Sequence, residues 1–410
     1  MIELFAAIAF NGMIQRAPES ALLESWRDEA LLRGRDSALW IQGDCPQLIV
    51  KVSSHSGSSE NAILLHSTTL LAAKIHHDAL ELLKSNSRDI YWAVTCGGIS
   101  TATFIHSFFK KLEGFEAELS TSEKVQLATI GKLFPDLSKV KFVWNEGAPF
   151  DSSTFAPWIM APIGISQRGL WSGRVRFQAL NPGDDIASDW AKKNGLLMTA
   201  LEHLQNSSRA SKWSLRSLHY ELAELVSRFS RSDSAWNRFQ NFFLPRLFFY
   251  RREWDWMLSS RWVTNGFSPL SENGQGEVLL DFYFLGSKEQ REIERELSDE
   301  LLEVLGPEVS VDIETIHLSG FQRSVFEGKE ARAIEDVLRR LPQVVPVPVI
   351  STELSESRFF REAGLAVFEL LPLQISQPFF QPTDLDSLPL KGESIHRAAE
   401  IEAKILKEAL

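Results

Sequence analysis

Short apolar segments alternate with amphipathic ones in the first 150 residues. Buried strands are predicted by the apolar runs at 48–52, 62–65, 88–95 and 140–144. Apolar residues at helical spacing predict helices over 69–84 and 100–112. Strands and helices that alternate in this way are typical of a parallel or mixed sheet with both faces covered. We therefore expect an α/β fold built on a mixed twisted sheet with helices on both faces.

The pattern changes between residues 166 and 319. Strands are predicted at 170–177, 277–285 and 309–318, with helices over 185–205, 214–229 and from Ser287, where Ser287 and Gln290 resemble a capping box. This order favours a small antiparallel sheet with helices on one face. After Phe321 the alternation of the first segment returns. We predict a discontinuous α/β domain, 1–165 and 320–410, interrupted by a smaller α+β domain, 166–319.

Composition excludes several classes of protein. Asp and Glu number 54 against 43 Lys and Arg, a formal net charge of −11 that disfavours nucleic-acid binding over the whole surface. The two cysteines, Cys45 and Cys96, are too few for a disulfide framework or a cysteine-based zinc site. The opening apolar run, 1–10, is too short to span a bilayer, and the sequence contains no apolar stretch of about 18 residues. We expect a cytoplasmic protein with no membrane span and no nucleic-acid partner.

Three strings resemble motifs of one known family. They are Ser355-Glu356-Ser357-Arg358-Phe359-Phe360, Phe142-Val143-Trp144-Asn145-Glu146-Gly147 and Ile63-Leu64-Leu65-His66. Taken in their order along the chain, they resemble the motifs of the two-zinc metallopeptidases that include aminoacylase, glutamate carboxypeptidase and carboxypeptidase S (peptidase family M twenty). The resemblance implies a catalytic α/β domain interrupted by a lid domain through which family members dimerise. It also implies that His66 and Glu146 occupy metal-ligand positions and that Arg358 meets a substrate carboxylate.

Other positions depart from the family's metal-binding pattern. Thr68 stands where the family has the Asp of His-x-Asp, and Val94 stands at the position of the bridging Asp. Pro389 replaces the final ligand His, and the adjacent Glu-Glu pair that supplies the general base is absent between 113 and 123. A centre that holds two zinc ions needs about five ligands, and this chain retains two of them. The sequence thus predicts a degenerate metal site. We expect no catalytic residue and no cofactor.

We therefore expect a peptidase-like scaffold that acts as a non-catalytic binding or interaction protein, with a small peptide or N-acyl amino acid as ligand and a homodimer through the lid domain. One alternative is an active metal-dependent amide hydrolase, a carboxypeptidase or N-acyl amino acid hydrolase, whose rebuilt site would use zinc. A second alternative is a partner-binding protein that acts through residues 205–262. That segment holds five of the twelve tryptophans and a local net charge of +5. The same composition also suits core packing, self-association, a membrane surface or nucleic acid.

Each candidate residue also has a structural interpretation. His66 could bond the backbone at a strand end, Glu146 could hold a loop or cap a helix, and Arg358 could pair with Glu353 or Glu356. His76 and His77 are adjacent in a predicted helix, so we interpret them as solvated or capping residues, because metal pairs on helices use i,i+4 spacing. Cys96 lacks an identifiable base and is not predicted to be a nucleophile.

Overall fold

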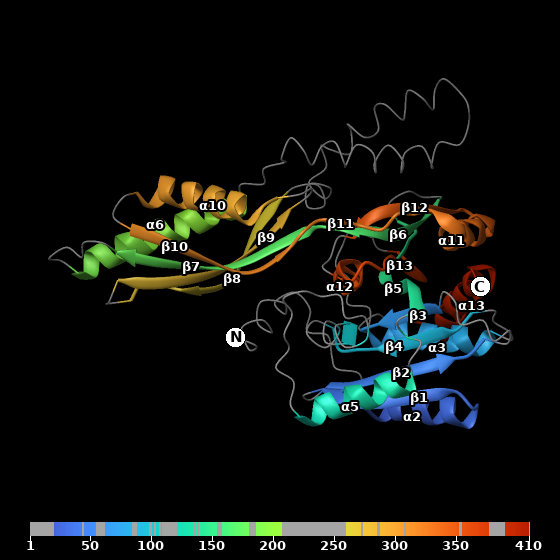
Figure 1. Ribbon diagram of the computed structural model, residues 1–410. Coiled ribbons are helices and arrows are strands. Elements are labelled where there is room, and N and C mark those ends of the chain that lie inside the picture. The colour runs from blue at the N-terminus through green and yellow to red at the C-terminus, as the bar shows by residue number, and fades with distance from the viewer. Residues whose placement is uncertain are drawn as a thin grey trace, which may run out of the picture. The chain divides into compact units, whose positions relative to one another are not determined.

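The computed structural model describes two sheets and the helices that cover them (Figure 1). The described residues are 20–409 apart from the segments 43–44, 55–61, 84–87, 98–100, 102–103, 106–107, 109–120, 135–136, 138, 154–157, 180–185, 207–259, 272–273, 285–287, 307–308, 352–354 and 377–389. Contacts divide the chain into two compact units, and the smaller one contains the described elements between Arg168 and Phe321.

The larger unit is built on a nine-stranded mixed sheet. Its strand order is β1-β2-β4-β3-β5-β13-β6-β11, and β12 also pairs with β6. Strands β4, β3, β5 and β13 are parallel neighbours, whereas β1, β2 and β11 pair antiparallel with their neighbours. The strands are β1 (Asp36–Gln42), β2 (Cys45–Val52), β3 (Ala62–Ser67), β4 (Ile90–Val94), β5 (Val140–Asp151), β6 (Ile159–Gln167), β11 (Gln322–Arg323), β12 (Val344–Ser351) and β13 (Ala366–Ile375).

Helices cover both faces of this sheet because its strands are apolar on both sides. Ile63 and Leu65 of β3 join a core cluster with α2 (Ser20–Leu32), α3 (Leu70–Leu82), α11 (Gly328–Arg340) and α13 (Gly392–Ala409). Ala62 and Leu64, which alternate with them, join a second cluster with α5 (Thr121–Leu133) and α12 (Ser357–Glu362). We call these the α3/α13 face and the α5/α12 face. The predicted mixed sheet with helices on both faces is confirmed.

The smaller unit is a four-stranded antiparallel sheet with strand order β10-β7-β9-β8. Two helices, α6 (Ile186–Asn206) and α10 (Gln290–Leu305), pack on its apolar side through a common core. Its strands are β7 (Gly169–Ala179), β8 (Arg261–Ser268), β9 (Gln275–Phe284) and β10 (Val309–Ser319). The predicted capping box is wrong, because α10 begins at Gln290 with Glu289 as its N-cap and no side-chain capping bond.

Most of the tryptophan- and arginine-rich segment, 207–259, lies outside the described residues, as does the predicted helix 214–229. Trp262 is the only one of its five tryptophans that the structure describes. Its ring is 5% exposed and stacks on Phe282 with ring centroids 4.2 Å apart. Trp262 therefore belongs to the core of the smaller unit, and the other interpretations of the segment stay predictions.

Candidate functional site

Polar residues form a row across the parallel strands β3, β5 and β13, where the regular pairing between these strands ends. Neighbouring strands pair His66 of β3 with Asn145 of β5, and Asn145 with Glu369 of β13. All three residues are buried, with at most 3% of each exposed. Ligand sites in α/β sheets lie at the carboxyl ends of strands, so this row occupies the expected place for a functional site.

His66 uses both of its ring nitrogens in hydrogen bonds within the protein. Nδ1 lies 2.7 Å from Asn145 Oδ1, and Nε2 lies 2.9 Å from Thr95 Oγ1. Because Asn145 Oδ1 can only accept, Nδ1 donates and Nε2 accepts from the threonine hydroxyl. Burial lowers the pKa of His66 to about 4, against a smaller opposing effect of the Asn145 hydrogen bond. His66 is therefore neutral near pH 7, and neither nitrogen can bind a metal without losing its partner.

The hydrogen bonds continue from both ends of this pair. Thr95 Oγ1 lies 2.6 Å from Thr101 Oγ1, and Asn145 Nδ2 donates to Ser357 Oγ at 2.8 Å. The backbone N–H of Ser357 donates to Ser355 Oγ, which in turn donates to Glu369 Oε1 at 2.7 Å. The result is one continuous chain of hydrogen bonds from Thr101 to Glu369, which we call the polar row.

Glu369 ends the polar row in a buried ion pair. Its Oε1 lies 3.1 Å from Arg361 Nη1, and its Oε2 accepts a hydrogen bond from Ser351. Burial lowers the pKa of Arg361, while Glu369 opposes this shift. Arg361 also donates to the backbone carbonyls of Gly164 and Val367, so its charge is compensated inside the protein.

Glu146 has a different environment from His66. Its carboxylate accepts hydrogen bonds from the backbone N–H groups of Thr68 and Thr69, at 3.2 and 3.1 Å, and from both hydroxyls. Thr69 is the N-cap of α3. A carboxylate at this position neutralises unpaired N–H groups and interacts favourably with the helix dipole. The interpretation of Glu146 as a helix-capping residue therefore accounts for all of these contacts.

The two residues at predicted metal-ligand positions point to opposite faces of the sheet. On β5, Asn145 is two residues from Val143 and therefore shares its side of the sheet, the α5/α12 face, where Asn145 bonds His66. Glu146 lies on the same side of β5 as Phe142 and Trp144, which belong to the α3/α13 face, and it contacts the start of α3. The sheet therefore separates the carboxylate of Glu146 from the imidazole of His66.

Gly147, the last residue of the family-like string, is required for a close approach between strands. A Cβ at this position would lie 2.5 to 2.8 Å from backbone atoms of Glu369 and Leu370 on β13. No side chain fits there without moving one of the two strands. The glycine of this motif thus maintains the sheet itself.

Arg358 lies on α12, and the structure shows no ion pair between it and Glu356, the one predicted partner that lies within the described residues. Its guanidinium carbon lies 4.5 Å from the centre of the Phe359 ring. Its Nη1 is buried and has no hydrogen-bond partner within the described part of the chain. Glu353 is outside the described residues. Arg358 therefore retains hydrogen-bonding capacity for an anionic group.

The remaining positions contribute no ligand within the described chain. Val94 is fully buried in the apolar core of the α3/α13 face. Cys96 is disulfide-bonded, so it has no thiol that could act as a nucleophile. Pro389 and the acidic residues 113, 116 and 118 lie outside the described residues.

His76 is buried, which corrects its interpretation as a solvated or capping residue. Its Nδ1 lies 2.6 Å from Glu402 Oε1 of α13, and neither side chain is exposed. Burial opposes protonation of His76, but the charges of Glu402 and Glu146 and the hydrogen bond to Glu402 together raise its pKa. This pair could not be predicted from local pattern, because 326 positions separate its members.

Thr95, His66 and Asn145 have the connectivity of a hydroxyl nucleophile, a base and an orienting amide. Acyl-transfer enzymes use this connectivity at comparable distances. Here, however, His66 and Thr95 are 0% exposed, and the low pKa makes His66 a weak base. The ring of Phe360 lies edge-on to His66 at 4.9 Å. The arrangement therefore serves hydrogen bonding rather than attack on a substrate.

The fold has clear relatives among solved structures. A metallo-carboxypeptidase of the M twenty family from Sulfolobus solfataricus matches with a TM-score of 0.52 and 12% identity, over 95% of this chain and 94% of that one. The chain has the fold of the M twenty peptidases. Human carnosine dipeptidase 1 matches with a TM-score of 0.55 and 10% identity, over 100% of this chain and 95% of that one.

A dinuclear metal binding peptidase of the M twenty family from Bacillus subtilis also matches, with a TM-score of 0.51, 8% identity and coverage of 94% and 90%. No family model and no curated protein sequence matches the chain. At these identities the likeness establishes the M twenty fold. Among the described helices, none is long and apolar enough to cross a membrane.

Proposed function

We propose that this chain is a non-catalytic member of the M twenty peptidase fold that binds a small ligand or partner. The observation that carries the proposal is the state of His66, whose two nitrogens are both bonded to neutral protein groups. A zinc ion could bind this ring only by breaking a buried hydrogen bond and leaving Asn145 or Thr95 without a partner. The polar row thus takes the place that a metal centre would need.

The position of Glu146 supports the same proposal. A rebuilt mononuclear site would have to unite Glu146 with His66, yet their side chains lie on opposite faces of the sheet. Moving Glu146 would also remove four hydrogen bonds from the start of α3. An active hydrolase would therefore need a metal site that uses only one of the two predicted ligands, His66 or Glu146, together with ligands from elsewhere in the chain.

Arg358 is the residue that we propose for ligand binding. Its buried Nη1 has no hydrogen-bond partner among the described residues, and a guanidinium suits a carboxylate through paired hydrogen bonds. The ligand class that follows is a small peptide or an N-acyl amino acid, bound through its carboxylate. Dimerisation through the smaller unit remains part of the proposal.

Two measurements on the full-length protein test this proposal. Protein loaded with zinc is assayed against dipeptides and N-acetyl amino acids for hydrolysis, and calorimetry measures their binding. We expect no turnover that a chelator abolishes, and binding that Arg358→Gln weakens about tenfold or more because charge-assisted bonds are lost. Arg332→Gln is the control, since Arg332 is an exposed residue of α11.

The proposal fails if the loaded protein hydrolyses these compounds in a chelator-sensitive way, or if two zinc ions bind per chain and His66→Gln removes both. The proposed role of Arg358 in binding the ligand is wrong if Arg332→Gln weakens binding as much as Arg358→Gln does.

A further inference from the structure

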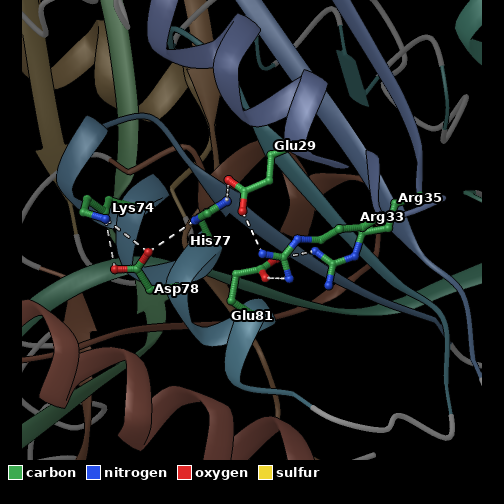
Figure 2. Close-up of polar contacts among 7 residues, drawn as sticks. All are labelled: Glu29, Arg33, Arg35, Lys74, His77, Asp78 and Glu81. Carbon is green, nitrogen blue, oxygen red and sulfur yellow. Dashed lines mark hydrogen bonds and ion pairs between the residues drawn. The ribbon is translucent and has the colours of Figure 1, made fainter. Parts of the chain in front are cut away.

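Three side chains from α2 and α3 converge at a second place in the larger unit. Glu29 comes from α2, and His77 and Glu81 come from one face of α3 at i,i+4 spacing (Figure 2). One nitrogen or oxygen from each lies within 4.8 Å of the others, and His77 Nε2 lies 3.4 Å from Glu29 Oε2. Ligands at zinc bond lengths in a tetrahedral site are about 3.4 Å apart, so one edge of such a site already exists.

Each of the three side chains is oriented by a contact at its other polar atom. His77 Nδ1 lies 3.2 Å from Asp78 Oδ1, Glu81 Oε1 lies 2.7 Å from Arg35, and Glu29 Oε1 lies 2.8 Å from Arg33. The remaining atoms, Nε2 of the histidine and one oxygen of each glutamate, approach one another (Figure 2). Outer contacts of this kind fix ligand orientation in metal sites, where a carboxylate is one of the usual partners of the second histidine nitrogen.

Aromatic packing holds the histidine ring in place. The ring of Trp26 stacks on His77 with centroids 5.5 Å apart and an interplanar angle of 19°, and Trp92 packs against it at 5.6 Å. The side chain of His77 is 13% exposed and that of Glu81 17%, whereas Glu29 is 39% exposed. The ring is thus preorganised, and an ion can reach it from the solvent on the side of Glu29.

We propose that Glu29, His77 and Glu81 bind one divalent transition-metal ion of the zinc class. One imidazole and two carboxylates are a donor set that zinc accepts, with water in the fourth position. The site belongs to α2 and α3 and shares no residue with the polar row.

Arg33 is the natural competitor of the metal. Its guanidinium bonds both Glu29 and Oε2 of Glu81, so it supplies positive charge between the two carboxylates. Its side chain is 47% exposed and can turn into the solvent, while Arg35 stays on the other oxygen of Glu81. Removal of Arg33 should therefore strengthen metal binding, whereas a purely structural ion-pair network predicts no metal binding in either protein.

The test is calorimetric titration of the metal-free, full-length protein with zinc chloride. We expect one ion per chain, affinity at least tenfold weaker in His77→Gln and in Glu81→Gln, and tighter binding in Arg33→Ala. Glu29→Gln extends the series at the most exposed ligand, where a folding defect is least expected. The matched control is His396→Gln, because His396 and Glu400 have the same i,i+4 spacing on α13 but are 61% and 48% exposed.

The proposal is overturned if neither the wild-type protein nor Arg33→Ala binds zinc at 100-fold excess. It is equally overturned if His396→Gln abolishes binding while His77→Gln and Glu81→Gln leave it unchanged, or if Arg33→Ala weakens it. One ion that depends on Glu81 differs in number and in residues from the two ions that would refute the proposed non-catalytic function. The two proposals can thus fail separately.

Discussion

His66 carries the main argument at the scale of single residues. In a metal enzyme this ring would give a lone pair to zinc, whereas here the ring joins Thr95 to Asn145. Both partners are neutral, and the ring is fully buried. A buried neutral histidine resists protonation because the charged form would lose its solvation.

The low pKa of His66 predicts how stability changes in acid. The unfolded chain binds a proton on His66 below about pH 6.5, whereas the folded protein does so only near pH 4. The contribution of this residue is therefore complete above pH 6.5 and is lost as the pH falls toward 4, by up to about 3 kcal/mol. Urea unfolding between pH 7 and pH 4 measures this loss.

A substitution separates His66 from the other titrating groups. His66→Gln should lower the free energy of unfolding at pH 7 yet give a flatter dependence on pH between 6.5 and 4. His396→Gln, at an exposed position, should keep the wild-type slope. An unchanged slope in His66→Gln would show that other residues cause the acid sensitivity.

At the scale of elements, α3 is held at two points. Glu146 binds its first N–H groups, and His76 pairs with Glu402 of α13 across an interface rich in alanine. Small side chains let the two helices approach closely, which excludes water from the ion pair. Loss of one member leaves the other buried without compensation.

Substitutions in this pair should be strongly non-additive. We expect His76→Leu alone to lower the free energy of unfolding by about 3–5 kcal/mol, and His76→Leu with Glu402→Leu to recover much of that loss. Thermal and urea unfolding of the single and double variants measure the coupling. Additive effects would mean that the pair contributes through packing alone. Since the pKa of His76 is raised, its stabilisation is complete below pH 6.5 and falls as the pH rises through the raised value.

Elements were predictable wherever the local pattern decided them. The apolar runs of β3, β4 and β5 and the alternation in β7 and β10 predicted strands. A continuous apolar run indicates burial on both faces of a strand, and alternation indicates burial on one face. The start of α10 was not predictable from Ser287, since the competing start at Glu289 differs by only two residues. Element ends depend on small energies that tertiary packing changes easily.

Side-chain partners were less predictable than elements. The i,i+4 spacing of His77 and Glu81 was a usable signal, but their third partner, Glu29, lies on another helix. The burial of His76 depends on Glu402, near the other end of the chain. Asn145 belongs to the family-like string 142–147, but its bond to His66 depends on the register between β3 and β5.

At the scale of the whole molecule, the disulfide at Cys96 is the one covalent cross-link in the described chain, and the described residues include no free cysteine. We predict that the native protein does not react with a thiol reagent and that reduction lowers its free energy of unfolding by about 2–4 kcal/mol. Thiol titration before and after reduction, with thermal unfolding of both forms, tests this. Reactive thiols in the untreated native protein would contradict it. Disulfides are typical of oxidising compartments, and the cytoplasmic location expected from the composition stays a prediction.

The polar row also limits how the protein can change. Each inner member of the row is bonded to the member on either side, so a single replacement leaves a buried orphan group that costs about 1–3 kcal/mol. A lineage that replaced His66 or Asn145 alone would have to pass through such a weakened intermediate, unless the neighbouring member changed with it. The continuous hydrogen bonding from Thr101 to Glu369 thus couples substitutions on three neighbouring strands to one another.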